Sequence, residues 1–113
     1  MGPYLTLRER HDCKLAAYRT GVKALKPLLA AYAREHGGRF ILFGSAARGT
    51  PHDQSDVDII ADFPERGSTA ACSFADERCW ALGLTPDCRP IEWTSDKEVA
   101  RALDEGVALG ETP

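Results

Sequence analysis

The sequence contains no apolar run that approaches the roughly 20 residues of a membrane-spanning helix. Its beginning, MGPYLTLRER, also lacks the apolar core of a secretory signal peptide. Internal repeats, low-complexity stretches and linkers are absent too, and a length of 113 residues suits a single domain over residues 1–113. The sequence therefore predicts a one-domain cytoplasmic protein with no membrane contact.

The cysteines include no CxxC pair, and the three histidines do not cluster with them. Zinc sites use cysteine and histidine ligands at short, characteristic spacings, so a zinc site is not expected here. The thiols are instead expected to be free and buried, where they act as small apolar groups. The positions concerned are Cys13, Cys72, Cys79 and Cys88.

The charged residues are unevenly distributed, although the net charge is only −3. Residues 1–39 contain eight Lys and Arg against three Asp and Glu, a net charge of +5, which leaves −8 for residues 40–113. The simpler interpretation is a solvated helix face, and the alternative is a basic surface for an acidic partner. No basic run contains interleaved exposed aromatics, which argues against a dedicated groove for nucleic acid.

Residues 5–36 have the apolar periodicity of a helix. Pro27 lies inside this pattern, so we expect a kink or a break into two helices there. Two glycines then end the helix, since glycine readily adopts the left-handed conformation that follows a helix. This N-terminal helical segment spans residues 1–38, and the sheet with the remaining helices spans residues 39–113. The apolar stripe consists of Leu15, Tyr18, Val22, Leu25, Leu29 and Tyr32.

Three strands are expected after this helix, because short apolar runs there are bounded by glycine, proline and loop residues. Pro86 and Pro90 weaken the third strand, which we expect to be short or at an edge of the sheet. Between the first two strands, a turn, a single helical turn and a loop are expected. The predicted strands cover residues 39–43, 55–63 and 84–93.

Two more helices complete the predicted pattern. Ser68 or Thr69 can cap the first of them, and Thr94-Ser95 can cap the second. The short connection between the first two strands cannot form an ordinary crossover, so a purely parallel sheet is not expected. The predicted fold class is α+β, with a small mixed β-sheet flanked by helices. These two helices cover residues 68–82 and 96–105.

Asp56 and Asp58 lie two residues apart on a predicted strand, so both side chains project from the same face. Val57 and Ile59 then point into the core. Two neighbouring carboxylates repel each other unless a cation lies between them. Hard oxygen ligands at this spacing suit Mg²⁺, which keeps several waters and takes further ligands from substrate phosphates. The alternative is a solvated edge with two aspartates, against which the apolar neighbours on this strand argue.

Gly44 and Ser45 lie where the first strand ends. Glycine lets the backbone approach a phosphate closely, and a turn into a short helix directs amide N–H groups at an anion. The Ser45 hydroxyl adds a donor, while Arg48 can either reach a phosphate or pair with a nearby carboxylate. Phosphate on one side and Mg²⁺ on the other describe phosphoryl or nucleotidyl transfer.

Sites of this kind usually need a third carboxylate from a neighbouring strand, either to bind a second metal ion or to act as a base. The candidates in the third predicted strand are Asp87 and Glu92. They are five residues apart, so a regular strand would direct them to opposite faces of the sheet, and at most one of them fits.

The segment GSAARGTPHDQSDVDI, residues 44–59, resembles the signature of the DNA polymerase beta-like nucleotidyltransferase superfamily, in which Gly-Ser is followed after ten residues by Asp-x-Asp. It is most similar to the minimal nucleotidyltransferases of the MNT type, which are about this short. The clear resemblance covers residues 40–62 and continues loosely to the end. The family departs from this chain after Asp87, where it usually has two apolar residues and this chain has Cys88-Arg89-Pro90. The resemblance implies nucleotide binding by Gly44, Ser45 and Arg48, and Mg²⁺ binding and catalysis by Asp56, Asp58 and Asp87.

Minimal nucleotidyltransferases are commonly paired with a small helical HEPN protein as a toxin–antitoxin system. The resemblance therefore implies an antitoxin that transfers AMP from ATP to a hydroxyl of a HEPN toxin, with Mg²⁺ as cofactor. The alternative is a catalytically weak or degenerate fold that neutralises its partner by binding alone. Both a homo-oligomer and a hetero-oligomer with the toxin are compatible with the sequence. An aminoglycoside-type nucleotidyltransferase fits less well, because such enzymes need a further domain to hold the small molecule.

Overall fold

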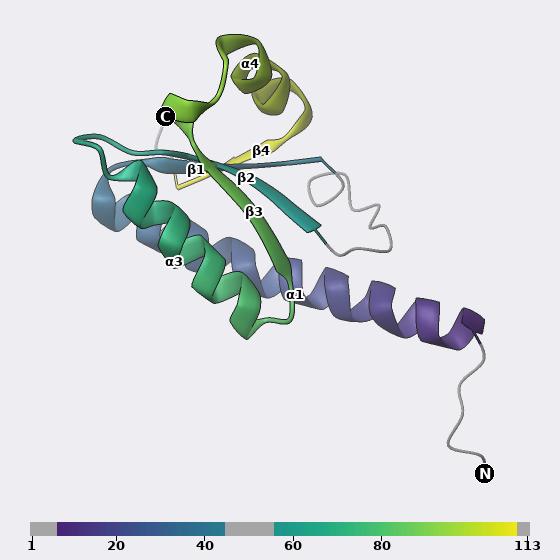
Figure 1. The fold of residues 1–113 in the computed structure, drawn as a ribbon. Helices are drawn as coiled ribbons and strands as arrows, with labels where there is room; N and C mark the ends of the chain where they lie inside the picture. Colours follow the sequence, from purple (N-terminus) through teal and green to yellow (C-terminus); the bar gives the residue numbers. More distant parts are fainter. Residues whose placement is uncertain (1–6, 45–55, 111–113) are drawn as a thin grey trace.

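The computed structural model describes residues 7–44 and 56–110, with side chains from residue 16 onward (Figure 1). These residues form three α-helices, one short 3-10 helix and a four-stranded sheet, and they confirm the predicted α+β class. In chain order the elements are α1 (Leu7–His36), β1 (Arg39–Phe43), β2 (Asp56–Asp62), α3 (Ser68–Ala81), β3 (Thr85–Pro90), η1 (Ile91–Trp93), α4 (Asp96–Glu105) and β4 (Val107–Leu109).

The four strands lie in the order β3-β2-β1-β4. β1 is antiparallel to both β2 and β4, whereas β2 and β3 are parallel, so the sheet is mixed as predicted. β3 ends at Pro90 rather than at residue 93, and it lies at an edge, as its prolines indicate. β4 is missing from the predicted order, because its three residues are too few to show an alternating pattern.

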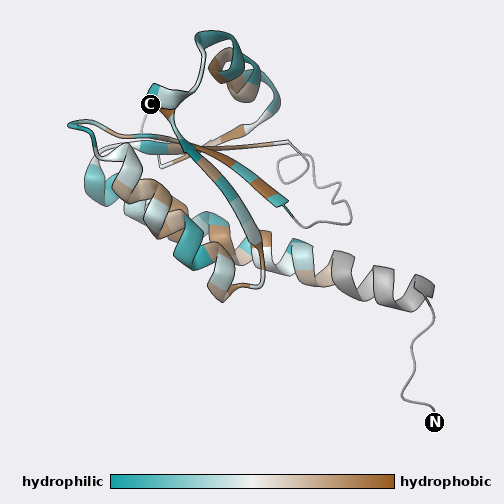
Figure 2. Cartoon of the chain, in the orientation of Figure 1, coloured by the Kyte–Doolittle hydropathy of each residue, from teal (hydrophilic) through white to brown (hydrophobic). Residues whose placement is uncertain are grey.

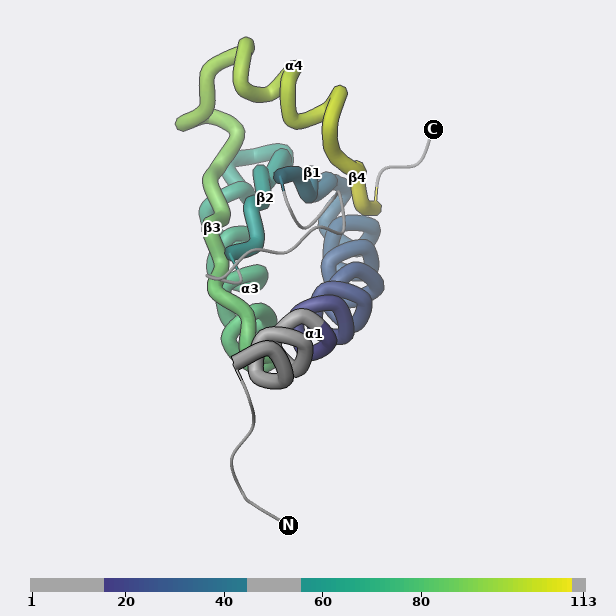
Figure 3. Tube along the Cα trace, turned by 90° about the vertical axis from the view of Figure 1, so that its right-hand side faces the viewer, coloured from purple at the N-terminus to yellow at the C-terminus, as the bar shows by residue number. Residues whose placement is uncertain are grey.

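Helices cover both faces of this sheet, with α1 and α3 on one face and α4 on the other (Figures 1 and 3). The larger core lies beneath α1 and α3. A smaller cluster of Ile41, Ile60 and Ala102 lies beneath α4. Because both faces are covered, the middle of each central strand is apolar on both faces, over residues 40–42 in β1 and 59–61 in β2 (Figure 2). The largest side chains of the main core that are fully buried are Leu25, Leu29, Phe40, Leu42, Val57 and Ile59.

α1 is one continuous helix, so of the kink or break predicted at Pro27 the break into two helices is wrong. Pro27 is exposed, whereas Leu25 and Leu29 on either side of it are fully buried against the sheet. Packing of this apolar stripe outweighs the hydrogen bond that proline cannot donate, and water can solvate the carbonyl that is left free. Although α1 has 30 residues, no helix within the described ranges combines the length and apolar character that crossing a membrane requires.

The predicted caps are confirmed for α4 but not for α3. Ser95 precedes α4, and its hydroxyl accepts a hydrogen bond from the Glu98 N–H at 3.2 Å. α3 has Gly67 at its N-cap without a side-chain cap, so the expectation for Ser68 or Thr69 is wrong. Ser68 is fully buried inside α3, where its hydroxyl accepts a hydrogen bond from the Phe63 N–H at 3.0 Å.

Three of the four cysteines are described, and all three are free thiols. Cys72 and Cys79 on α3 are buried as predicted, while Cys88 on β3 is half-buried. The Sγ atoms of Cys88 and Cys72 are 2.9 Å apart, so this pair packs α3 directly against β3. Burial raises the pKa of the Cys79 thiol to about 12, which keeps this side chain protonated and inert.

Candidate functional site

The two aspartates of β2 lie on the face of the sheet that α4 covers. Val57 and Ile59 alternate with them and are fully buried in the core beneath α1 and α3, as predicted. Asp56 and Asp58 are both half-buried, and Asp58 lines a cavity between the sheet and α4. The alternation of β2 therefore places both carboxylates on one face, away from the main core.

Gly44 brings the backbone directly against one of these carboxylates. It follows β1 with φ +70°, a left-handed conformation that glycine adopts without strain. A Cβ atom at this position would overlap the Oδ2 atom of Asp58. The first half of the sequence motif thus lies in contact with the second half, although the chain between them, including Ser45 and Arg48, is outside the described residues.

Asp87 is the third acid that the structure brings to this place. β2 and β3 pair in register with Asp58 opposite Asp87, and in a parallel pair such partners share a face. Burial raises the pKa of Asp58, and the charge of Asp87, a hydrogen bond with its carboxyl group and the charge of Asp56 raise it further. These three acids therefore repel one another on the face of the sheet that α4 covers.

Glu92, the competing candidate, lies elsewhere. The strand ends at Pro90, so Glu92 belongs to the 3-10 helix η1 and not to β3. Its Oε1 atom accepts a hydrogen bond from the buried Ser68 hydroxyl at 3.1 Å. Glu92 thus helps to join η1 to α3, and of the two candidates only Asp87 lies beside Asp58.

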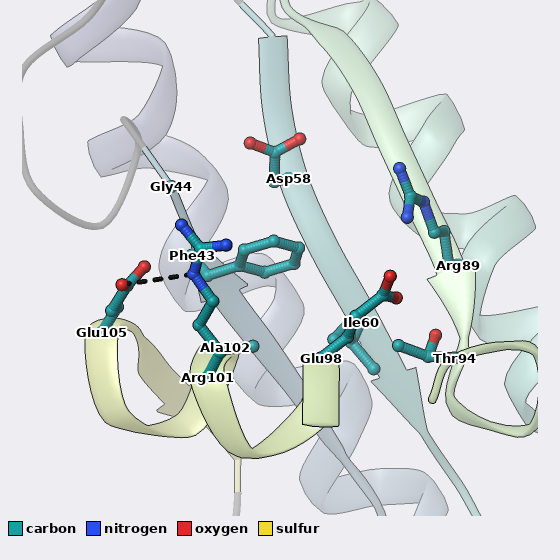
Figure 4. Close-up of a pocket in the computed structure, with 10 residues that line it drawn as sticks. All are labelled: Phe43, Gly44, Asp58, Ile60, Arg89, Thr94, Glu98, Arg101, Ala102 and Glu105. Carbon is teal, nitrogen blue, oxygen red and sulfur yellow. Dashed lines mark hydrogen bonds and ion pairs between the residues drawn. The ribbon is translucent and has the colours of Figure 1, made fainter. Parts of the chain in front are cut away.

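Two arginines also line the cavity, which has a volume of about 300 Å³ and is drawn in Figure 4. Arg89 of β3 pairs with Asp87, with 3.3 Å between Nη2 and Oδ2 and 3.5 Å between Nε and Oδ1. Arg101 of α4 pairs with Glu105 at 3.3 Å. The residues that line the cavity are Phe43, Gly44, Asp58, Ile60, Arg89, Thr94, Glu98, Arg101, Ala102 and Glu105.

The contribution of α4 to this cavity does not follow from the motif. A signal for it does exist, because Glu98, Arg101, Ala102 and Glu105 recur at spacings of three and four and therefore share one face of the helix. That face mixes acidic, basic and small residues, so the sequence does not distinguish it from a solvated surface. Its position opposite Asp58 becomes clear only from the packing of α4 on the sheet.

The fit of these acids to Mg²⁺ can be judged from their chemistry and positions. Within the described ranges, no group of three acidic, histidine or cysteine side chains is close enough together to hold a metal ion. Mg²⁺ is, however, usually held by only one or two carboxylates together with waters and substrate phosphates. Asp56 and Asp58 supply such a pair of hard oxygen donors on one face, and Asp87 lies opposite Asp58 as a further oxygen donor.

A comparison with protein families matches residues 23–109 to the nucleotidyltransferase domain. The chain belongs to this family. The match spans the second half of α1 and every strand of the sheet, so the resemblance to the nucleotidyltransferase superfamily is confirmed over most of the chain. A comparison with curated proteins finds no match.

Proposed function

We propose that this nucleotidyltransferase transfers AMP from ATP to a hydroxyl group of a protein in a Mg²⁺-dependent reaction, in the cytoplasm. The target that best suits a domain of the minimal MNT type is a HEPN toxin, for which the protein would act as the antitoxin. The observation that carries this proposal is the position of Asp58, with Asp87 opposite it in β3 and the Gly44 backbone in contact with its carboxylate.

Each acid has a part in this reaction. Asp56 and Asp58 would hold Mg²⁺, which neutralises charge on the triphosphate when it is bound. Asp87 lies beside them and can accept the proton of the attacking hydroxyl. That oxygen then forms a bond to the α-phosphorus, the bond to pyrophosphate breaks, and pyrophosphate leaves. The Gly44 backbone leaves room for Asp58 to keep its place.

A protein acceptor is supported by the surface beside the cavity. Trp93 is 78% exposed and directly precedes Thr94, which lines the cavity. Tryptophan is rarely this exposed on a surface without a partner, and it is enriched among the residues that dominate the binding energy of interfaces. A partner protein that covers Trp93 would also lie against η1 and Thr94, at one edge of the cavity.

One observation favours the second candidate function, in which the protein neutralises its partner by contact alone. Arg89 forms an ion pair with the carboxylate of Asp87. If this ion pair persisted in the loaded enzyme, Asp87 could not act as a base, and only binding would remain.

A single experiment separates the two functions. The protein is incubated with ATP, Mg²⁺ and a HEPN-type protein as the partner, and the partner is then weighed by mass spectrometry. We expect the partner to gain one or more AMP units, and to gain none when Asp56 is replaced by alanine. A partner that is neutralised without any change in mass would contradict the transfer reaction and support binding alone.

Replacement of the third acid gives a further prediction. We expect Asp87→Asn to lower the rate of AMP transfer about 100-fold, the usual size of a lost general base. Glu92→Gln keeps the hydrogen bond from Ser68 within reach and should leave the rate within about two-fold of the parent protein. The measurement is the initial rate at saturating ATP. A greater loss in Glu92→Gln than in Asp87→Asn would show that the roles of the two acids are reversed.

A further inference from the structure

Arg89 lies beside Asp87, the third acid of the candidate site. Its guanidinium group makes two hydrogen bonds to Asp87, and the charges of Glu98 and Asp58 also act on it. Figure 4 shows Asp58 between Gly44 on one side and Arg89 on the other. Of the two arginines that line the cavity, Arg89 is therefore the one that pairs with an acid of this group.

We propose that Arg89 acts as a tethered counter-ion that makes this site bind a divalent cation together with a nucleotide in preference to the free cation. This inference rests on the proposed Mg²⁺-dependent function. A free cation held by Asp56 and Asp58 must bear the repulsion of the positive charge of Arg89, which pairs with Asp87 beside them. A cation that binds together with a triphosphate also brings negative charge. The guanidinium group of Arg89 can then exchange its ion pair with Asp87 for one with a phosphate.

The geometry allows Arg89 to make that exchange. Asp87 and Arg89 are two residues apart on an edge strand and therefore share one face of it. Their side chains are 46% and 52% exposed, respectively. An ion pair this exposed contributes only about 0–1 kcal/mol to stability, so exchanging Asp87 for a phosphate costs little. Guanidinium groups also bind phosphate with two parallel hydrogen bonds, so the new contact would be at least as favourable as the old one.

Binding of Mn²⁺, which replaces Mg²⁺ and is visible by electron paramagnetic resonance, tests this inference without any turnover. We expect Arg89→Met to bind free Mn²⁺ about three- to ten-fold more tightly than the parent protein, since one competing charge is removed. With a non-hydrolysable ATP analogue present, this advantage should disappear or reverse. Arg89→Lys keeps the charge and should retain weak binding of free Mn²⁺.

Arg101→Met is the matched control. Arg101 lines the same cavity but pairs with Glu105, so this change should leave the affinity for free Mn²⁺ unaltered. Equal affinity of the parent protein and Arg89→Met for free Mn²⁺ would overturn the inference and leave the proposed function intact. An equal gain in Arg101→Met would overturn it as well. If neither protein bound Mn²⁺ even with the ATP analogue, the Mg²⁺-dependent function itself would fail.

Discussion

Replacing Asp58 by asparagine is expected to reduce AMP transfer by about 1,000-fold or more, because the amide cannot supply the negative charge that Mg²⁺ requires. The same change should make the metal-free protein more stable. Burial and the charges of Asp87 and Asp56 raise the pKa of Asp58 in the folded state, so its ionised form opposes folding at neutral pH. Since Asp58 is half-exposed, solvent limits this effect to a fraction of a kcal/mol, which corresponds to about 2–4 °C in melting temperature.

The gain in stability expected for Asp58→Asn depends on pH. The pKa of Asp58 lies above the ordinary value of 3.8 only in the folded protein. Below pH 3.8, Asp58 is protonated in both the folded and the unfolded protein, so its repulsion with the other acids is absent. The repulsion is complete once the pH exceeds the raised pKa of Asp58 in the folded protein. The stability advantage of Asp58→Asn should therefore be present at pH 7 and should vanish toward pH 3.8, as measured by thermal unfolding.

Asp62→Asn is the control for this experiment. Asp62 lies on the same strand and face as Asp58, but its Oδ2 atom pairs with Arg39 at 3.0 Å. Its replacement should lower the melting temperature slightly and leave AMP transfer unchanged. If Asp58→Asn were also less stable than the parent protein at pH 7, the repulsion among the three acids would not exist.

Replacing Gly44 by alanine is expected to reduce AMP transfer by about 100-fold, because the change displaces the carboxylate of Asp58. The Cβ atom would overlap Oδ2 of Asp58, so the carboxylate must move, and a displacement of about 1 Å can cost that much in rate. Alanine at φ +70° also costs about 1–2 kcal/mol of stability.

Gly37→Ala separates these two effects. Gly37 has nearly the same φ, +72°, but nothing lies within 4 Å of the Cβ atom that alanine would add. Both variants should therefore lose similar stability in chemical unfolding, and only Gly44→Ala should lose activity. Equal activities in the two variants would mean that the contact between Gly44 and Asp58 has no part in the reaction.

The elements that rest on periodicity could be predicted from the sequence. The apolar stripe of α1, the alternation of β2 and the cap at Ser95 all reflect side chains a few residues apart. Because Val57 and Ile59 alternate with them and face the main core, this alternation also predicts that Asp56 and Asp58 point to the opposite face. The fold class followed from these local patterns, and the superfamily from the resemblance of residues 44–59 to a known signature.

Features that depend on distant segments could not be predicted in this way. The choice between Asp87 and Glu92 depends on the pairing register of β2 and β3 and on where β3 ends. Ser68 resembles a helix cap in the sequence, yet burial against Phe63 and Glu92 determines its actual hydrogen bonds. Arg89 looks like a departure from the family pattern, and only the structure shows that it contacts Asp87.

The parallel pairing of β2 and β3 also affects the stage of folding at which the acidic centre of Asp58 and Asp87 can form. A parallel pair needs a crossover, which α3 provides here. Asp58 and Asp87 are therefore distant in the sequence, and they come together in space only when β3 pairs with β2. Contacts between distant segments form late, because the intervening chain must first lose its conformational freedom. β1 and β2 can therefore pair early in synthesis, while the acidic centre is completed only after the ribosome has released β3.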